Sequence, residues 1–222
     1  MTSEVQAAAN EPQIAPAIPL SLFAFSIFYG GMVCIAGVLG AKQVALGPLA
    51  VEAGIFPFLL LVAMSSAVAE LHGRKTADRL VRFGFVPLIT AILLTLFVLR
   101  LPTDEGMYPP AKEAFPIILG QSWRMMFAGI IAYGTSVTLN VFIFSKLAER
   151  GTRMLALRAA IASALSQIVD TLIFITISFY GERDIGPLIM GQALAKVVLS
   201  FVLVPLVIMG FVALGRRLDA RQ

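Results

Sequence analysis

Residues 157–180 read LRAAIASALSQIVDTLIFITISFY, and this stretch decides the fold. Its 24 residues carry only two charges, Arg158 and Asp170, and most of the others are apolar. About 20 such residues are needed to cross the roughly 30 Å of hydrocarbon in a bilayer as an α-helix. The apolar residues run continuously instead of alternating with polar ones, which favours a helix over a strand of a membrane β-barrel. The stretch therefore predicts a transmembrane helix.

Five further stretches of similar polarity lie along the chain. They cover residues 21–40, 54–71, 83–101, about 115–147 and 185–214. The composition agrees, since 59% of the 222 residues are hydrophobic, 14% are charged and the mean hydropathy is +0.90. A soluble domain has about 25% charged residues. We predict an all-α integral membrane protein, a bundle of about six transmembrane helices filling residues 20–215.

The two ends of the chain are more polar than the predicted bundle. Residues 1–19 contain three prolines, two glutamates and no Lys or Arg. They predict a disordered tail, and they lack the basic start that is typical of a signal peptide. Residues 216–222 contain three arginines and predict a short basic tail. We expect both tails in the cytoplasm, with no folded domain outside the membrane.

Basic residues fall on alternate polar segments between the predicted spans. Three segments are basic, with the residues His72, Arg74, Lys75, Asp78, Arg79 and Arg82, then Lys146, Arg150, Arg153 and Arg158, then Arg216, Arg217 and Arg221. The intervening segments are near neutral or acidic. Because cytoplasmic loops of membrane proteins are enriched in Lys and Arg, we predict that both termini are cytoplasmic. The net charge of +4 then marks orientation, and nucleic-acid binding is not expected.

Several classes of protein are excluded by residues that the sequence lacks. One cysteine, Cys34, and one histidine, His72, cannot form an internal disulfide framework or a zinc site of several thiolates. The sequence has no G-x-x-x-x-G-K-S/T phosphate loop. It also has no G-x-S-x-G nucleophile motif. We therefore predict no enzyme activity, no metal and no cofactor.

Polar side chains inside the predicted spans are the candidates for function, because such groups usually face the bundle interior or water. These candidates are Glu70, Arg124, Asn140, Gln167, Asp170 and Lys196. Asp170 falls near mid-membrane, with Gln167 three residues and Ser166 four residues before it. Spacings of three and four place side chains on one face of a helix. One face of this span therefore presents a carboxylate, an amide and a hydroxyl.

Two interpretations of these polar groups stay open. In the first, they bond one another and hold the helices together, with Asp170 and Lys196 as a structural ion pair. Glu70 and Arg124 would then reach toward the membrane interfaces. In the second, a carboxylate, amides and a cation bind a polar, neutral solute such as a purine-like heterocycle. The aromatic residues available to stack on such a ring are Phe28, Phe56, Phe127, Tyr133, Phe144, Phe174 and Phe179.

The sequence resembles a known family of membrane transporters. NVFIFSKL at 140–147, SALSQIVDTLIF at 163–174 and AELHGRK at 69–75 resemble the queuosine precursor transporter family, also called the vitamin uptake transporter family. The resemblance implies a bundle similar to the substrate-binding components of energy-coupling-factor transporters. It implies uptake of 7-cyano-7-deazaguanine or 7-aminomethyl-7-deazaguanine across a bacterial inner membrane. Carried over by position, the residues of the substrate path are Glu70, Arg124, Asn140, Arg158, Gln167, Asp170 and Lys196.

The sequence departs from the family pattern at three places. Ser65-Ser66 stand where Thr-Asp is frequent, Val137 stands where Gln is frequent, and His72 stands where Tyr or Phe is common. Each difference removes a polar or stacking contact. The resemblance therefore implies a class of substrate without selecting one member of it.

We expect a transporter whose site lies between the second, fourth, fifth and sixth spans. In this hypothesis Asp170 accepts hydrogen bonds from the amidine-like edge of a 7-deazapurine, and Gln167 and Asn140 bind other ring atoms. Glu70 and Arg124 line the two ends of the path. The alternative is a substrate-binding subunit that needs partner ATPases, and a membrane-embedded enzyme is a third hypothesis. The solute and the lipid bilayer are the predicted partners, and a homo-oligomer is left open.

Overall fold

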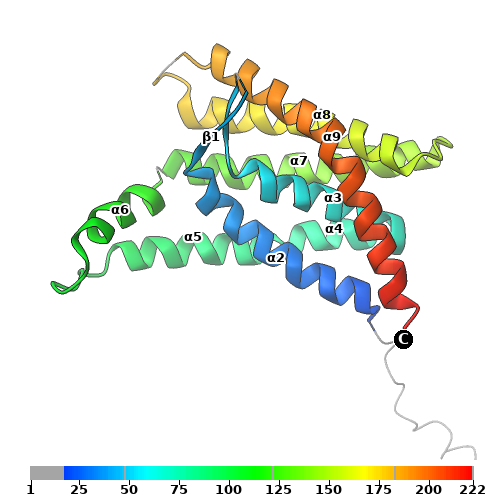
Figure 1. The fold of residues 1–222 in the computed structure, drawn as a ribbon, viewed down its shortest axis with the longest axis horizontal. Coiled ribbons are helices and arrows are strands. Elements are labelled where there is room, and N and C mark those ends of the chain that lie inside the picture. Colours follow the sequence, from blue (N-terminus) through cyan, green and yellow to red (C-terminus); the bar gives the residue numbers. More distant parts are fainter. Residues whose placement is uncertain (1–17, 48, 122, 183, 222) are drawn as a thin grey trace, which may run out of the picture.

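The computed structural model describes residues 18–221 except residues 48, 122 and 183, and it is a helical bundle (Figure 1). Its helices are α2 (Leu20–Gly40), α3 (Ile55–His72), α4 (Arg74–Phe83), α5 (Phe85–Leu99), α6 (Pro109–Leu119), α7 (Trp123–Glu149), α8 (Leu155–Phe179) and α9 (Gly186–Asp219). In the described part of the chain, six helical segments are long and apolar enough to cross a membrane. The prediction of an all-α membrane bundle of about six helices is confirmed. Most of the predicted tail at 1–19 lies outside the described residues.

The third spanning segment starts earlier than the sequence predicted. It covers Arg74–Leu99 and consists of α4 and α5, which meet at Gly84. Its first ten residues are largely polar, so the apolar pattern alone placed the start at residue 83. Gly73 separates this segment from α3 with a φ of 81°, a conformation that glycine adopts without steric cost.

The fourth predicted span, over residues 115–147, is wrong at its start. The chain forms α6 and then α7, with a break between Leu119 and Trp123. Gly120 ends α6, and its backbone N–H donates to the carbonyl of Pro116 at 2.8 Å. Glycine is the usual residue just after a helix. Part of the segment between the third and fourth predicted spans is therefore helical, because α6 begins at Pro109.

A short β-hairpin, which the sequence did not predict, connects α2 to α3. Strands β1 (Gln43–Leu46) and β2 (Leu49–Glu52) pair antiparallel with Gln43 opposite Glu52. Strands of four residues are too short for their alternation to be recognised reliably. The hairpin reaches across one end of the bundle, and β2 packs against α9 (Figure 1).

Helix α8 lies between α7 and α9 and packs extensively against both. Its buried face consists largely of small residues, among them Ala159, Ala160, Ala162, Ser163 and Ser166. Small side chains let membrane helices approach closely, and helix contacts then replace contacts with lipid. Helix α3 packs against α2, α7 and α9 and completes the bundle.

The first and last helices meet at one end of the bundle. The backbone N–H of Ser21 donates to Oδ1 of Asp219 at 2.9 Å, and the Ser21 hydroxyl donates to Oδ2 at 2.8 Å. Ends on the same side agree with an even number of spans. We call the half of the bundle that contains Ser21, His72 and Asp219 the terminal half, and the half that contains the hairpin and α6 the distal half.

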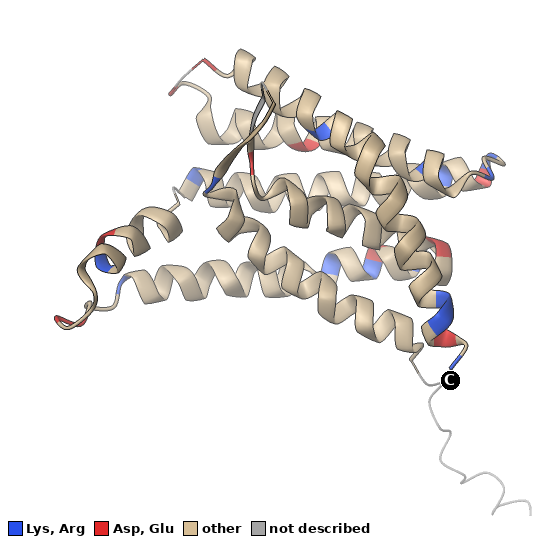
Figure 2. Ribbon diagram, viewed as in Figure 1, with Lys and Arg blue, Asp and Glu red and all other residues tan. Residues whose placement is uncertain are grey.

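Charged residues differ between the two ends of the bundle. Figure 2 shows Lys and Arg on α4, in the turn between α7 and α8 and at the end of α9, all in the terminal half. Two arginines of the predicted basic tail, Arg216 and Arg217, lie in the last turn of α9. Basic residues at a helix C-terminus interact favourably with the helix dipole.

Candidate functional site

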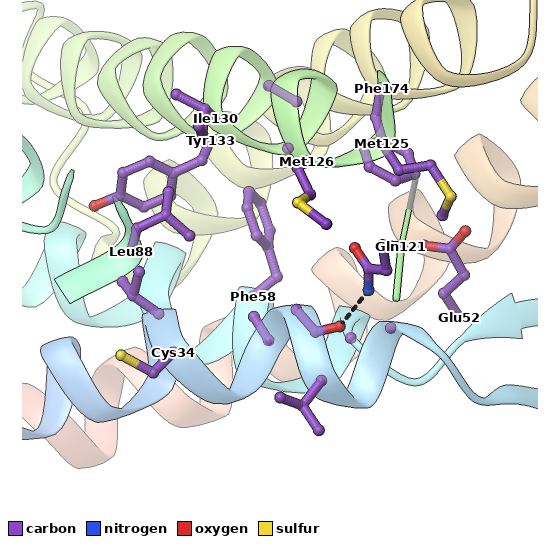
Figure 3. Close-up of a pocket in the computed structure, with 18 of the residues that line it drawn as sticks. Cys34, Glu52, Phe58, Leu88, Gln121, Met125, Met126, Ile130, Tyr133 and Phe174 are labelled. Carbon is purple, nitrogen blue, oxygen red and sulfur yellow. Dashed lines mark hydrogen bonds between the residues drawn. The ribbon is translucent and has the colours of Figure 1, made fainter. Parts of the chain in front are cut away.

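A cavity of about 220 Å³ lies in the distal half of the bundle (Figure 3). Its walls come from the distal parts of α2, α3, α5, α7, α8 and α9 and from the end of α6, and β2 contributes Val51 and Glu52. Ligand pockets usually measure about 300–1,000 Å³, are mostly apolar and carry a few polar groups. The volume is therefore suited to a small solute.

An ion pair between α8 and α9 lines this cavity. Asp170 Oδ2 lies 2.7 Å from Lys196 Nζ, and the two side chains are only 8% and 12% exposed. The Ser136 hydroxyl of α7 donates to Asp170 Oδ1 at 3.1 Å. The interpretation of Asp170 and Lys196 as a structural ion pair thus describes the contact correctly. Both residues also face the cavity, so the pair is available to a solute.

Glu52 is a cavity residue that the sequence analysis missed. It ends β2, and Gln192 Nε2 donates to its Oε1 at 3.3 Å. Burial raises the pKa of Glu52 above its usual value of 4.5; Lys196 and the Gln192 hydrogen bond oppose this rise, and Asp170 adds to it. One signal pointed to Glu52, because it is the only charged residue between residues 43 and 69.

Aromatic and thioether side chains form the apolar wall of the cavity. They include Phe58, Met125, Met126, Tyr133 and Phe174 (Figure 3). Tyr133 and Phe174 are among the predicted stacking residues, whereas Phe58 was missed. Lys196 Nζ lies 6.0 Å from the centre of the Phe58 ring. Phe28, Phe56 and Phe127 are at least 40% exposed on the outside of the bundle, which is the surface expected to meet lipid.

Asn140 and Gln167 lie one helical turn from the ion pair, on its terminal side. Both are fully buried and neither lines the cavity. Asn140 Nδ2 donates to Ser66 Oγ at 2.9 Å and to the Val62 carbonyl at 3.3 Å. Within the described residues, the Asn140 side-chain oxygen and both polar atoms of the Gln167 amide have no hydrogen-bond partner. These amides form a polar layer on the terminal side of the cavity.

Glu70 and Arg158 form a second ion pair, in the terminal half. Glu70 Oε2 lies 2.7 Å from an Arg158 guanidinium nitrogen, with side chains 25% and 7% exposed. The same guanidinium lies over the Phe144 ring, 4.8 Å from its centre. The pair joins the end of α3 to the start of α8 and does not line the cavity.

Arg124 caps the distal end of α8. Its guanidinium donates to the carbonyls of Ile177 and Tyr180 at 3.0 Å each and to Glu182 at 2.9 Å. A cation at a helix C-terminus satisfies carbonyls that have no helical partner. Arg124 and Glu70 therefore lie at opposite ends of the bundle, as expected, but both have protein partners and neither faces the cavity.

The residues at the cavity combine hydrogen-bond acceptors, a cation and ring surfaces, which suits binding of a planar polar solute. Among the described residues, no group of three or more His, Cys, Asp or Glu side chains could hold a metal ion.

Comparison with known proteins adds to this geometry. The family model described as "Putative vitamin uptake transporter" matches residues 52–210. A "Probable queuosine precursor transporter" from Bacillus subtilis (strain 168) is 27% identical over 158 residues, covering 70% of this chain and 68% of the relative. No solved structure matches. The matched region begins at Glu52 and includes the Asp170–Lys196 pair.

Proposed function

Since this chain belongs to the vitamin uptake transporter family, we propose that it imports a 7-deazaguanine precursor of queuosine through the distal cavity. It is a multi-pass membrane protein of a transporter family. Transport of a small molecule, rather than catalysis, is the activity to which this membership points. The proposed solutes are 7-cyano-7-deazaguanine and 7-aminomethyl-7-deazaguanine.

The observation that carries this proposal is the Asp170–Lys196 pair at the wall of a cavity of about 220 Å³. A heterocycle with no phosphate is compatible with this volume. Lys196 can donate to a ring carbonyl or nitrogen, and Asp170 can accept from a ring N–H. Phe174 and Phe58 line the same cavity and offer faces for the ring.

In this proposal Asn140 and Gln167 act when the site opens toward the terminal half. Asn140 and Gln167 are the first polar groups on that side of the pair, and their unsatisfied amide atoms are suited to receive the solute there. Glu70 lies at the terminal end of the proposed path and Arg124 at the distal end, each bound to other residues of the protein. Alternating exposure of one central site to the two sides of the membrane moves a solute in many transporters.

The proposed orientation places both tails in the cytoplasm of a bacterial cell and the protein in the inner membrane. The basic residues of the terminal half support it through the positive-inside rule. The cavity would then lie in the outer half of the membrane, where an importer takes up its solute. Cysteine-accessibility labelling of single cysteines in the α7–α8 turn and in α6, in a Cys34→Ser background, tests this orientation.

Binding and uptake test the proposal in two steps. The purified protein should be stabilised against thermal unfolding by 7-cyano-7-deazaguanine, and less by guanine. Cells should accumulate the labelled deazaguanine when they express the protein. Uptake into liposomes by the purified protein supports a self-sufficient transporter. Binding without liposome uptake, with transport restored only by partner ATPases, supports a binding subunit of the energy-coupling-factor type.

A further inference from the structure

Glu52 reaches the cavity from outside the helical bundle. It is the last residue of β2, two residues before the N-terminal flank of α3, and β2 packs against α9. Figure 3 shows the Glu52 side chain at the same end of the cavity as Gln121 and Met125. A side chain at this place can contact a solute on the opposite side from the ring-stacking residue Phe58.

The two carboxylates of the cavity differ in how much hydrogen-bonding capacity they have left. Asp170 accepts from Lys196 on one oxygen and from Ser136 on the other, and the ammonium compensates its charge. Among the described residues, Glu52 makes one side-chain hydrogen bond, the 3.3 Å contact with the neutral Gln192, and no ion pair within 4.0 Å. A carboxylate offers about four acceptor positions in all. Glu52 is therefore the better acceptor for a donor that arrives with the solute.

Charge in the cavity leads to the same conclusion. Two carboxylates face one ammonium, so the ionised site has one excess negative charge. A phosphate or carboxylate solute would be repelled by it, and a solute edge that carries two parallel N–H donors would be favoured. Such an edge can satisfy both oxygens of a carboxylate at once, and bidentate contacts of this kind provide strong discrimination between bases.

We infer that Glu52 determines which heterocycle binds, by accepting two hydrogen bonds from adjacent N–H groups on one edge of the ring while the Asp170–Lys196 pair binds elsewhere on the solute. Gln192 positions the Glu52 carboxylate through their hydrogen bond. This inference rests on the proposed function. It assigns recognition of the amidine-like edge to Glu52 of β2, whereas the sequence analysis assigned that role to Asp170. The solute class is a planar base that carries a ring N–H next to an exocyclic amino group.

The test compares two ligands that differ in one donor. Binding of 7-cyano-7-deazaguanine and of its analogue lacking the 2-amino group is measured by calorimetry with the full-length protein in detergent. The wild-type protein should prefer the ligand with the amino group by roughly 10- to 100-fold. Glu52→Gln should lower this preference to about threefold or less, because its amide presents one donor to the edge in place of an acceptor.

Two further variants keep the result interpretable. Glu113→Gln, an exposed carboxylate on α6 outside the cavity lining, should retain the wild-type preference. Gln192→Ala should weaken the preference less than Glu52→Gln does. Binding of the analogue without the amino group by Glu52→Gln establishes that this variant is folded.

The outcomes separate the inference from the function on which it rests. If the wild-type protein binds neither of these two ligands, the proposed function fails. If it binds with a strong preference that Glu52→Gln retains, the role of Glu52 is refuted and the proposed function stands. Equal binding of both ligands by the wild-type protein also refutes the role of Glu52.

Discussion

The distal and terminal halves of this bundle contain similar elements but differ in packing. Each half has a carboxylate–cation pair with a 2.7 Å contact, the buried pair Asp170–Lys196 in one and the partly buried pair Glu70–Arg158 in the other. The distal pair lines a cavity, whereas the terminal pair does not, and its Arg158 guanidinium lies over the ring of Phe144. The same helices are thus separated at one end and closed at the other.

Contacts between α2, α3 and α9 close the terminal half. The Ser21 hydroxyl donates to Asp219 at 2.8 Å and lies 2.7 Å from His72 Nε2. The rings of Phe25 and Phe211 pack 5.8 Å apart, and Gly215 allows the close approach of Leu71. A transporter must open this half and close the other to release its solute. Under the proposed function, the distal contacts are the ones that bind solute and the terminal contacts are the ones that must open.

Breaking the distal pair should have the largest effect on stability. Lys196→Met leaves the buried Asp170 carboxylate without its cation, and removing one member of a buried pair costs about 3–5 kcal/mol. The double variant Asp170→Asn with Lys196→Met should recover most of that loss in denaturant unfolding, but it should not bind a deazaguanine. Equal stability of the single and double variants would show that the pair is not coupled.

Breaking the terminal pair should have a smaller effect and leave binding intact. Arg158→Met removes the partner of Glu70, whose side chain is 25% exposed and keeps access to solvent, so we expect a loss of about 1–3 kcal/mol. Affinity for the deazaguanine, measured by calorimetry, should stay close to the wild-type value. A large loss of affinity would place Glu70 and Arg158 in the binding site and remove the distinction between the halves.

Loosening the terminal contacts should affect local opening more than global stability. Asp219→Asn weakens the hydrogen bonds that Ser21 donates, and this should lower the free energy of unfolding by about 1 kcal/mol. Amide hydrogen exchange at the end of α9 should become faster, with no change in the amides that surround Asp170. Glu149→Gln, which removes an exposed pair with Lys146 in the same half, serves as the matched control and should leave exchange unchanged.

The smallest predicted effect is that stability and solute affinity depend on pH through Glu52 of the distal half. The pKa of Glu52 is raised in the folded protein, so its contribution to stability is present at low pH and decreases as the pH rises through the folded-state pKa. Solute binding has the opposite sign, because the ionised carboxylate is the better acceptor, and affinity should fall as the pH is lowered through that pKa. Glu52→Gln should remove this dependence, and a pH profile identical to that of the wild type would contradict it.

The sequence predicted six spanning segments, with wrong starts for the third and fourth, and it singled out Asp170 and Lys196, because both features depend on polarity along helices. Continuous apolar stretches identified the spans, and helical spacing placed Gln167 and Asp170 on one buried face. Asp170 also stood out as a carboxylate near mid-membrane. These properties are local and can be derived from the order of residues.

Other features could not be predicted, since they depend on contacts distant in sequence. Glu52 enters the cavity only because the hairpin folds toward α9, and its partner Gln192 is 140 residues away. Arg124 was expected along the solute path, but the carbonyls at the end of α8 bind it. The break at Gly120 was missed because the polar stretch that follows it, with Gln121 and Arg124, is short and apolar residues resume at Met125.

Uptake of labelled 7-cyano-7-deazaguanine is the most direct test of the central claim that the distal cavity carries a queuosine precursor. Cells without another route for the compound would express the wild-type protein, Asp170→Ala or the surface control Glu113→Gln, with membrane levels matched by immunoblot. We predict accumulation with the wild-type protein and the control, and loss of accumulation with Asp170→Ala. Undiminished uptake by Asp170→Ala would contradict the account.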